Sequence, residues 1–323
     1  MLLFVLKRLA QSVLVMLVVA LIAFALFRYV GDPVDSMVGQ DTTLEQRADL
    51  RERLGLNDSF LVQYARFIGR AATGDFGQSY RLRQPVDELL AERFPATFEL
   101  SLVSAVMALL IGVPMGVYTA LNRRGLLSRG FMTLSLIGIS LPTFLIGILL
   151  ILVFGVVLRW LPTFGRGDVV QVGWWTSGLM TRSGLSSLIM PAITLAIFQM
   201  TLIVRLIRAE MLEVLRADYV KFARARGLKP RTINFSIALK NTLVPVMTII
   251  GLQIGSIIAF AIITESVFQW PGMGLLFIQA IENVDIPVMA AYLMLIAFIF
   301  VVINLVVDVL YFVVDPRLRV QGR

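Results

Sequence analysis

Few side chains in this sequence could carry out covalent or redox chemistry. Histidine and cysteine are both absent from the 323 residues. Their absence excludes thiolate metal sites, disulfides, imidazole general bases and Cys–His nucleophile pairs. The chain also contains neither G-x-x-x-x-G-K-[ST] nor G-x-G-x-x-G, the two common glycine-rich loops that bind nucleotide phosphates. We therefore expect no thiolate or imidazole metal site and no common nucleotide-binding loop in this chain.

Polar side chains within apolar stretches are the remaining candidates for function. Gln199, Gln253 and Ser256 lie inside long hydrophobic runs, and the last two are three residues apart, on one face of a helix. Polar groups inside a membrane span are candidates for a solute pathway, so we expect these three to line a pore. Glu265 lies near the end of its hydrophobic run, where it could form an outer gate, contact a docked protein or cap a helix.

The polar segment 210–227 is a third candidate. Its apolar residues recur at helical spacing: Met211, Leu215, Tyr219 and Phe222. Gly227, followed by Pro230, predicts the end of a helix. An amphipathic helix of this kind either rests on the inner surface of a membrane or docks into a groove on a partner, and the pattern does not separate these two readings.

The elements that must position these residues are hydrophobic helices. The sequence is 58% hydrophobic and 15% charged, with a mean hydropathy of +0.85, which is too apolar for a soluble domain. A spanning helix needs about 20 apolar residues. The stretches that meet this requirement are 9–29, 97–121, 131–158, 188–207, 243–268 and 288–314. We therefore predict an all-α integral membrane protein with six transmembrane helices.

The placement of basic residues predicts how these helices are oriented. With a cytoplasmic N-terminus, every lysine falls in a cytoplasmic segment, and the outside loop 269–287 contains neither lysine nor arginine. Basic residues are enriched in short cytoplasmic loops. The pattern predicts that both termini are cytoplasmic, and it accounts for the net charge of +8 without nucleic acid.

The long segment 30–96 is expected to lie outside the membrane and to be helical. A capping box formed by Thr42 or Thr43 with Glu45 or Gln46 begins one helix, and a second helical stretch covers 59–72. Pro85 begins a third helix with one apolar face. We expect this third helix to lie along the membrane surface and to lead into the second span.

Several blocks of sequence run in order along nearly the whole chain: Gly74-Asp75-Phe76-Gly77 with Pro85-Val86, 93–97, 191–195, 218–228, 265–274 and 308–317. Together they resemble the permeases of binding-protein-dependent ABC importers, specifically the first permease of the dipeptide, oligopeptide and nickel class. The general consensus has Glu-Ala-Ala where this chain has Lys221-Phe222-Ala223, a difference that is usual in the peptide branch. The consensus also ends in Leu-Pro, whereas the proline here comes later, at Pro245.

This resemblance implies that the chain is not an enzyme but a non-catalytic subunit, with no catalytic residue, no metal site and no cofactor of its own. It also implies that the segment 210–227 is a coupling helix that fits a cleft on an ATPase subunit. The docking residues it implies are Asp218, Tyr219, Val220, Ala223, Arg224, Ala225 and Gly227. The implied partners in the bacterial inner membrane are a second permease subunit in a heterodimer, two ABC ATPase subunits that bind ATP and Mg, and an extracytoplasmic solute-binding protein. The implied solutes are di- and oligopeptides, with nickel complexes, glutathione or sugars as alternatives.

The same reasoning divides the chain into three parts. Residues 1–94 form the first span and the outside segment, 95–314 the transport core, and 315–323 a cytoplasmic tail. A secondary transporter working alone is a rival interpretation, but it would show inverted repeats and ionisable groups at the membrane midplane. A membrane scaffold is a second rival, which the ordered family blocks disfavour.

Overall fold

A computed structural model describes residues 2–29, 34, 43–53 and 56–314, so the predicted tail 315–323 lies outside the described residues. The described chain is almost wholly helical, as predicted. Its helices are α1 (Leu2–Tyr29), α3 (Leu44–Arg53), α4 (Phe60–Ala72), α5 (Val86–Leu121), α6 (Leu126–Ser140), α7 (Thr143–Leu150), the π-helix η1 (Ile151–Val157), α8 (Arg182–Val214), α9 (Asp218–Ala225), the π-helix η2 (Thr232–Leu239), α10 (Lys240–Phe268), α11 (Met273–Glu282) and α12 (Ile286–Val314). Strands β1 (Val170–Val172) and β2 (Trp175–Ser177) form an antiparallel hairpin.

Several of these helices are long and apolar enough to cross a membrane. Among the described residues four meet the requirement unaided, within α1, α5, α8 and α12. Two bent pairs raise the number to as many as six, if each pair is one span. One pair joins α6 to α7 and η1 at 108°, and the other joins the second half of α10 to α11 at 74°.

The predicted third span, 131–158, is therefore wrong as a straight helix. It breaks between α6 and α7, where Leu141 has an extended backbone (φ −90°, ψ 133°) ahead of Pro142. Proline has no N–H to continue a helix, and it disfavours helical backbone at the residue before it. The Leu-Pro dipeptide inside an apolar run was therefore the sequence signal for this break.

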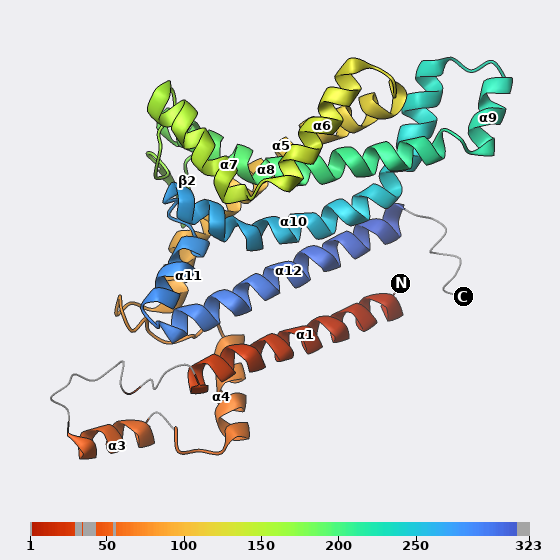
Figure 1. Ribbon diagram of the computed structural model, residues 1–323. Coiled ribbons are helices and arrows are strands. Elements are labelled where there is room, and N and C mark those ends of the chain that lie inside the picture. Colours follow the sequence, from red (N-terminus) through yellow and green to blue (C-terminus); the bar gives the residue numbers. More distant parts are fainter. Residues whose placement is uncertain (1, 30–33, 35–42, 54–55, 315–323) are drawn as a thin grey trace.

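The two ends of the molecule carry different segments (Figure 1). The start of α1, the end of α12 and the helix α9 lie at one end, whereas α4, α11 and the β-hairpin lie toward the other. The segments predicted to be cytoplasmic thus share one end, and those predicted to be outside share the opposite end. This arrangement agrees with the predicted orientation, which stays a prediction.

Close helix packing in the core depends on glycine. The pair Gly112-x-x-x-Gly116 on α5 faces α8, and a Cβ placed at Gly116 would lie 2.6 Å from Cβ of Ile207. The pair Gly251-x-x-x-Gly255 on α10 faces α12 in the same way, where a Cβ at the first glycine would overlap Val307. Small residues spaced four apart allow the backbones of membrane helices to approach. Both pairs therefore serve packing within this chain.

The helix that begins after Pro85 is continuous with the predicted second span, and its predicted place along the membrane surface stays a prediction. It forms the first turns of α5, a helix of 36 residues that is about 54 Å long, compared with about 30 Å of bilayer hydrocarbon. Val86, Leu89 and Leu90 are buried against α11 and α12, not against lipid. The apolar face was correctly recognised, but it packs on protein. The predicted boundary at residues 94 and 95 falls inside this helix.

Candidate functional site

The predicted coupling helix is shorter than the segment 210–227. The structure ends α8 at Val214 and begins α9 at Asp218, with an extended residue, Ala217 (φ −62°, ψ 150°), at the junction. The prediction of one continuous apolar face along this segment is therefore wrong. Its first half, Met211 and Leu215, belongs to α8 and the turn after it, and both side chains are buried.

Helix α9 has one inward face and one outward face. Val220 and Ala223 are 0% and 6% exposed, and they pack in a cluster that includes Ile207 of α8. Tyr219 and Phe222 are 48% and 64% exposed, so two aromatic rings face away from the chain. Two of the seven predicted docking residues, Val220 and Ala223, thus hold α9 in place and do not present their side chains to a partner.

The end of α9 is set by Gly227, as predicted. Gly227 has φ +77°, its N–H donates to Arg224 O at 2.9 Å, and Leu228 N–H donates to Ala223 O at 3.3 Å. These bonds form the glycine-based helix stop in which a left-handed residue satisfies the last carbonyls. Space is not the constraint, because nothing lies within 4 Å of a Cβ placed there. The backbone conformation alone therefore calls for glycine.

The outward surface of α9 is also charged. Lys221 Nζ donates to Asp218 Oδ1 at 2.8 Å, and this hydrogen bond lowers the pKa of the Asp218 carboxyl. Both side chains are largely exposed, so the pair adds little to stability. Arg226 lies with its guanidinium carbon 5.7 Å from the centre of the Phe222 ring. With Arg224 also exposed, this short helix and its last turn present an aromatic and mainly basic surface.

The three predicted pore residues come together between α8 and α10. Gln199 Nε2 donates to Ser256 Oγ at 3.3 Å, and the Ser256 hydroxyl lies 2.7 Å from Gln253 O and 3.1 Å from Gln253 Oε1. Gln199 is only 3% exposed, and its Oε1 has no hydrogen-bond partner among the described residues. The arrangement is a small polar patch with an acceptor to spare, set in apolar helices.

Glu265 is fully buried, and its hydrogen bonds give it a capping role. Its Oε1 accepts from the Thr97 hydroxyl at 2.6 Å, and its Oε2 accepts from Leu275 N–H at 3.0 Å. Thr97 Oγ1 in turn accepts from Met273 N–H at 2.8 Å. The carboxylate therefore caps the first turn of α11 and fixes the bend between α10 and α11 onto α5. With no exposed surface, it is not placed to touch a docked protein. The predicted outer gate at this residue stays a prediction.

The sequence analysis missed a buried ion pair at the hairpin end of the molecule. Arg166 Nη2 lies 2.7 Å from Glu99 Oε2, and both side chains are less than 10% exposed. The same carboxylate accepts from Trp175 Nε1 at 3.2 Å and from Gly178 N–H at 3.1 Å. These contacts attach the loop after η1 and the β-hairpin to α5. An acidic residue within a predicted span was the available signal, because such a group needs a partner.

A second buried carboxylate, also missed, connects segments that are far apart in the sequence. Asp285, between α11 and α12, accepts from the hydroxyl of Ser79 and from Tyr80 N–H at 3.2 Å. It thereby fixes the loop ahead of α5 to the loop ahead of α12. Nothing here resembles a metal site, since the described residues contain no group of three or more potential metal ligands from His, Cys, Asp or Glu.

The long apolar helices define a class, that of multi-pass membrane proteins, here with a short amphipathic helix, α9, between two of the long ones. The chain belongs to the family described as "Binding-protein-dependent transport system inner membrane component", whose model matches residues 112–320. The N-terminal model of the same family matches residues 1–101. The protein is therefore an inner-membrane permease of the ABC importer type, a family of non-catalytic subunits that work with ATPase, binding-protein and further permease partners.

Curated relatives cover nearly the whole chain. The di/tripeptide transport system permease protein DppB of Pseudomonas aeruginosa is 40% identical, over 99% of this chain and 100% of its own length. The oligopeptide transport system permease protein AppB of Bacillus subtilis is 37% identical, over 98% of this chain and 99% of its own. Inward-facing structures of the MetNI methionine ABC transporter share the fold alone, with a TM-score of 0.56 and 18% identity over 70% of this chain and 96% of theirs.

Proposed function

We propose that this chain forms half of the translocation pathway for di- and oligopeptides in an ATP-driven importer. The named relatives support the solute class, because proteins described as peptide permeases match the chain along its full length. The working assembly would contain a second, different permease subunit, two ABC ATPase subunits that bind ATP and Mg, and an extracytoplasmic solute-binding protein. Nickel complexes, glutathione and sugars are the competing solutes.

Helix α9 is the element through which we propose that the ATPase acts. The observation that supports this best is the exposure of Tyr219 and Phe222 on a short helix attached directly to α8 and η2. Exposed aromatic side chains flanked by arginine are the residue types that anchor protein interfaces. Asp218, Arg224, Ala225 and the stop at Gly227 complete the docking surface, while Val220 and Ala223 transmit its movement to α8.

ATP binding would draw the two coupling helices together and open the spans outward, and hydrolysis would reset them. A rigid connection between α9 and the spans is needed for this rocking movement. Val220 and Ala223 share one apolar cluster with Ile207 and Met211 of α8 and Ile233 of η2, and α9 contacts η2, so this cluster supplies such a connection. Movement of the ATPase would therefore be passed on without deforming α9.

The patch of Gln199, Gln253 and Ser256 is the part of the pathway that we propose contacts solute. A peptide offers backbone N–H donors, and Gln199 Oε1 is an acceptor without a partner among the described residues. An unmade hydrogen bond on a buried group costs about 1–3 kcal/mol, so a passing donor would be favoured there. Changing Gln199 to leucine should lower uptake of dipeptides while leaving ATPase binding intact.

The deciding experiment reconstitutes the complete importer and compares Phe222→Ala with Phe164→Ala. Both side chains are exposed phenylalanines, 64% and 58%, but Phe164 lies two residues before Arg166, which donates to Thr176 O of the β-hairpin. We expect Phe222→Ala to reduce co-purification of the ATPase and ATP-dependent dipeptide uptake, with Phe164→Ala retaining the ATPase. Equal ATPase retention in both variants would refute the docking role. The peptide assignment is tested by competition. It would be refuted if nickel, glutathione or a sugar abolished uptake and excess dipeptide did not.

A further inference from the structure

Two short segments lie side by side at the end of the molecule opposite α9 (Figure 1). One is the turn 79–85 ahead of α5, and the other is the segment 281–285, at the end of α11 and ahead of α12. Asp285 joins them, because its buried carboxylate accepts from the Ser79 hydroxyl and from Tyr80 N–H at 3.2 Å. The two segments therefore form one unit that connects α5 to α12.

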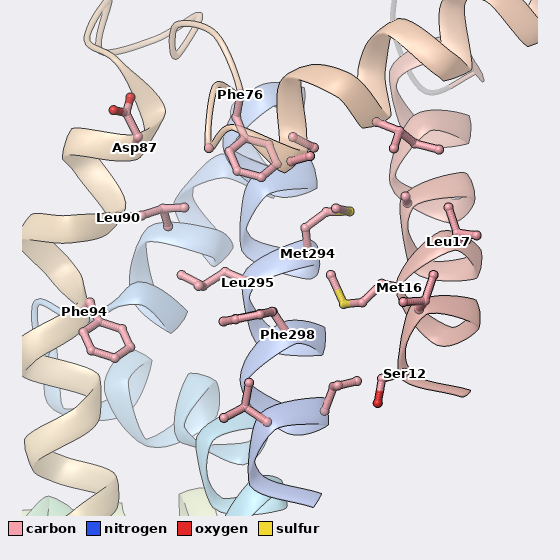
Figure 2. Close-up of a pocket in the computed structure, with 18 of the residues that line it drawn as sticks. Ser12, Met16, Leu17, Phe76, Asp87, Leu90, Phe94, Met294, Leu295 and Phe298 are labelled. Atoms are coloured by element: carbon pink, nitrogen blue, oxygen red, sulfur yellow. The ribbon is translucent and has the colours of Figure 1, made fainter. Parts of the chain in front are cut away.

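The turn ahead of α5 is held in a fixed shape. Arg83 N–H donates to Ser79 O at 3.0 Å and closes the turn. At its base, Phe76 packs against the apolar clusters that contain Leu90 of α5 and Met294 of α12 (Figure 2). The tip of the turn is therefore presented rigidly to the surroundings.

Each of the two segments holds a residue other than glycine in left-handed backbone. Arg83 has φ +55° and Val284 has φ +52°. This conformation is uncommon for any residue but glycine, and for a β-branched residue it is an outlier. Val284 takes the place after α11 where helices commonly end in glycine, and its N–H donates to Ile281 O at 3.2 Å. Backbone strain that the surrounding structure maintains is concentrated at functional sites, which directs attention to these two tips.

The tips expose side chains that the fold of this chain does not use. Arg81 and Arg83 are both exposed, and within the described part of the chain neither forms an ion pair, even with the exposed Glu282 of the second segment. Three apolar side chains beside them are 42–45% exposed: Leu82, Ile281 and Val284. Arginine beside apolar side chains is the composition of a protein contact. We call Arg81, Leu82, Arg83, Ile281 and Val284 the tip surface.

The tip surface lies well outside the bilayer. The stretch of α5 without a charged residue begins after Glu99, and the helical rise from Val86 to Glu99 is about 20 Å. A tilt of α5 by about 40° would still leave about 15 Å. The headgroup region adds only about 5–8 Å on each side of the hydrocarbon core, so lipid headgroups do not reach the two arginines.

A small solute is also a poor match for the tip surface. A single carboxylate would meet Arg81 or Arg83 in open water, where an ion pair contributes at most about 1 kcal/mol. A protein surface, in contrast, can cover all five side chains together and exclude water from the arginines. A second permease meets this chain across the spans, whereas a protein that arrives from the outside water meets the tips first.

We propose that the tip surface docks an acidic and apolar patch on the extracytoplasmic solute-binding protein. This inference rests on the proposed function, which requires such a protein, and on the predicted orientation. Carboxylates of the binding protein pair with Arg81 and Arg83, around an apolar contact at the other three side chains. Because Asp285 joins the two segments, docking engages α5 and α12 at once.

The test measures docking of the purified solute-binding protein, loaded with dipeptide, to the complete importer in nanodiscs by biolayer interferometry. Arg83→Glu reverses one charge on the tip surface. Arg159→Glu is the matched control, because Arg159 is also exposed, has the same φ of +55° and lies ahead of the β-hairpin. We expect Arg83→Glu to raise Kd about tenfold and to weaken the salt dependence of docking. Arg159→Glu should leave both unchanged.

A second variant separates docking from folding. Asparagine adopts left-handed backbone more readily than valine, so Val284→Asn should raise the melting temperature of the importer. The same change removes an apolar side chain from the tip surface and should raise Kd. A purely structural role for Val284 predicts the higher melting temperature with unchanged docking, which would count against the inference.

The remaining outcomes separate this inference from the proposed function. Equal docking by Arg83→Glu, Arg159→Glu and the unchanged importer would overturn the inference and leave the proposed function standing. Loss of the second permease from the Arg83→Glu importer would also overturn it, because the tip surface would then be a contact between permeases. If no binding protein docked to the unchanged importer or stimulated its uptake of dipeptides, the proposed function itself would be refuted, and the inference with it.

Discussion

The two ends of this permease are built by opposite means. The end that carries the β-hairpin is held by buried polar contacts between distant segments, among them Glu99 with Arg166 and Asp285 with Ser79. At the end that carries α9, this helix is held by apolar packing among the described residues, and its charged groups are exposed. Buried polar contacts fix one geometry, whereas a small helix on an apolar seat keeps a free surface for a partner. The hairpin end is therefore suited to act as a rigid frame, and α9 is suited to act as a docking element.

The largest effect is expected from breaking the buried ion pair. Glu99→Ala leaves Arg166 uncompensated in a buried place, and loss of one partner from a buried pair costs about 3–5 kcal/mol. We expect reduced amounts of folded protein and faster proteolysis of the loop after η1. Limited proteolysis and the melting temperature of the purified importer measure this.

The double variant Glu99→Met with Arg166→Met is the matched control, because it removes both charges together. It should melt closer to the unchanged protein than the single variant does. If the single variant melted like the unchanged protein, the hairpin end would not depend on this pair. The contrast between the two ends would then fail.

The next effect concerns the seat of α9. Ala223→Trp inserts a large ring where the native side chain is 6% exposed, and overpacking of this kind costs typically about 1–3 kcal/mol. We expect the protein still to insert in the membrane, but ATP hydrolysis to be uncoupled from uptake. The ratio of solute transported to ATP hydrolysed measures the coupling. Normal uptake by this variant would show that α9 does not transmit the movement.

A smaller effect should separate the backbone of α9 from its side chains. Gly227→Ala forces an alanine to φ +77°, at a cost of about 1–2 kcal/mol. Gly130→Ala is the control, since it also has open space around its Cβ but ordinary helical backbone within α6. We expect weaker ATPase co-purification for the first and no loss for the second. The same result for both variants would mean that the helix stop is not required.

These same residues show how much of the fold and of the candidate site could be predicted from the sequence. Most of the apolar runs and the stop at Gly227 depend on local spacing, and the structure has them as helices and as a helix end. Gln199, Gln253 and Ser256 come together as their spacing suggested, but their place along a pore stays a prediction. The pairing of Glu99 with Arg166 joins residues 67 apart, and spacing along one chain carries no information about such a contact. The burial of Val220 and Ala223 escaped prediction because the turn at Ala217 rotates α9 relative to α8. Contacts set by tertiary packing are therefore what pattern alone could not supply.

The smallest effect is expected from an exposed ion pair. It tests whether the strength of the Glu99–Arg166 pair comes from burial or from its position at the hairpin end. Arg70 and Asp75 form a pair outside the spans at 2.9 Å, with each side chain more than half exposed. The hydrogen bond from Arg70, helped by Gly77 N–H, lowers the pKa of the Asp75 carboxyl. A carboxyl with a lowered pKa adds stability above its unfolded pKa, and this stability is lost as the pH falls through the folded value. Exposure limits it to a few tenths of a kcal/mol.

Asp75→Asn should therefore lower the melting temperature only slightly at pH 7, and the difference should shrink as the pH is lowered below about 4. Melting curves of the unchanged and variant importers across this range measure the difference. A loss as large as that of Glu99→Ala would mean that location, and not burial, sets the strength of these contacts. A change in melting temperature near zero at pH 7 would mean that only the buried carboxylates, Glu99, Glu265 and Asp285, stabilise the hairpin end. The contrast with α9 would then be sharper.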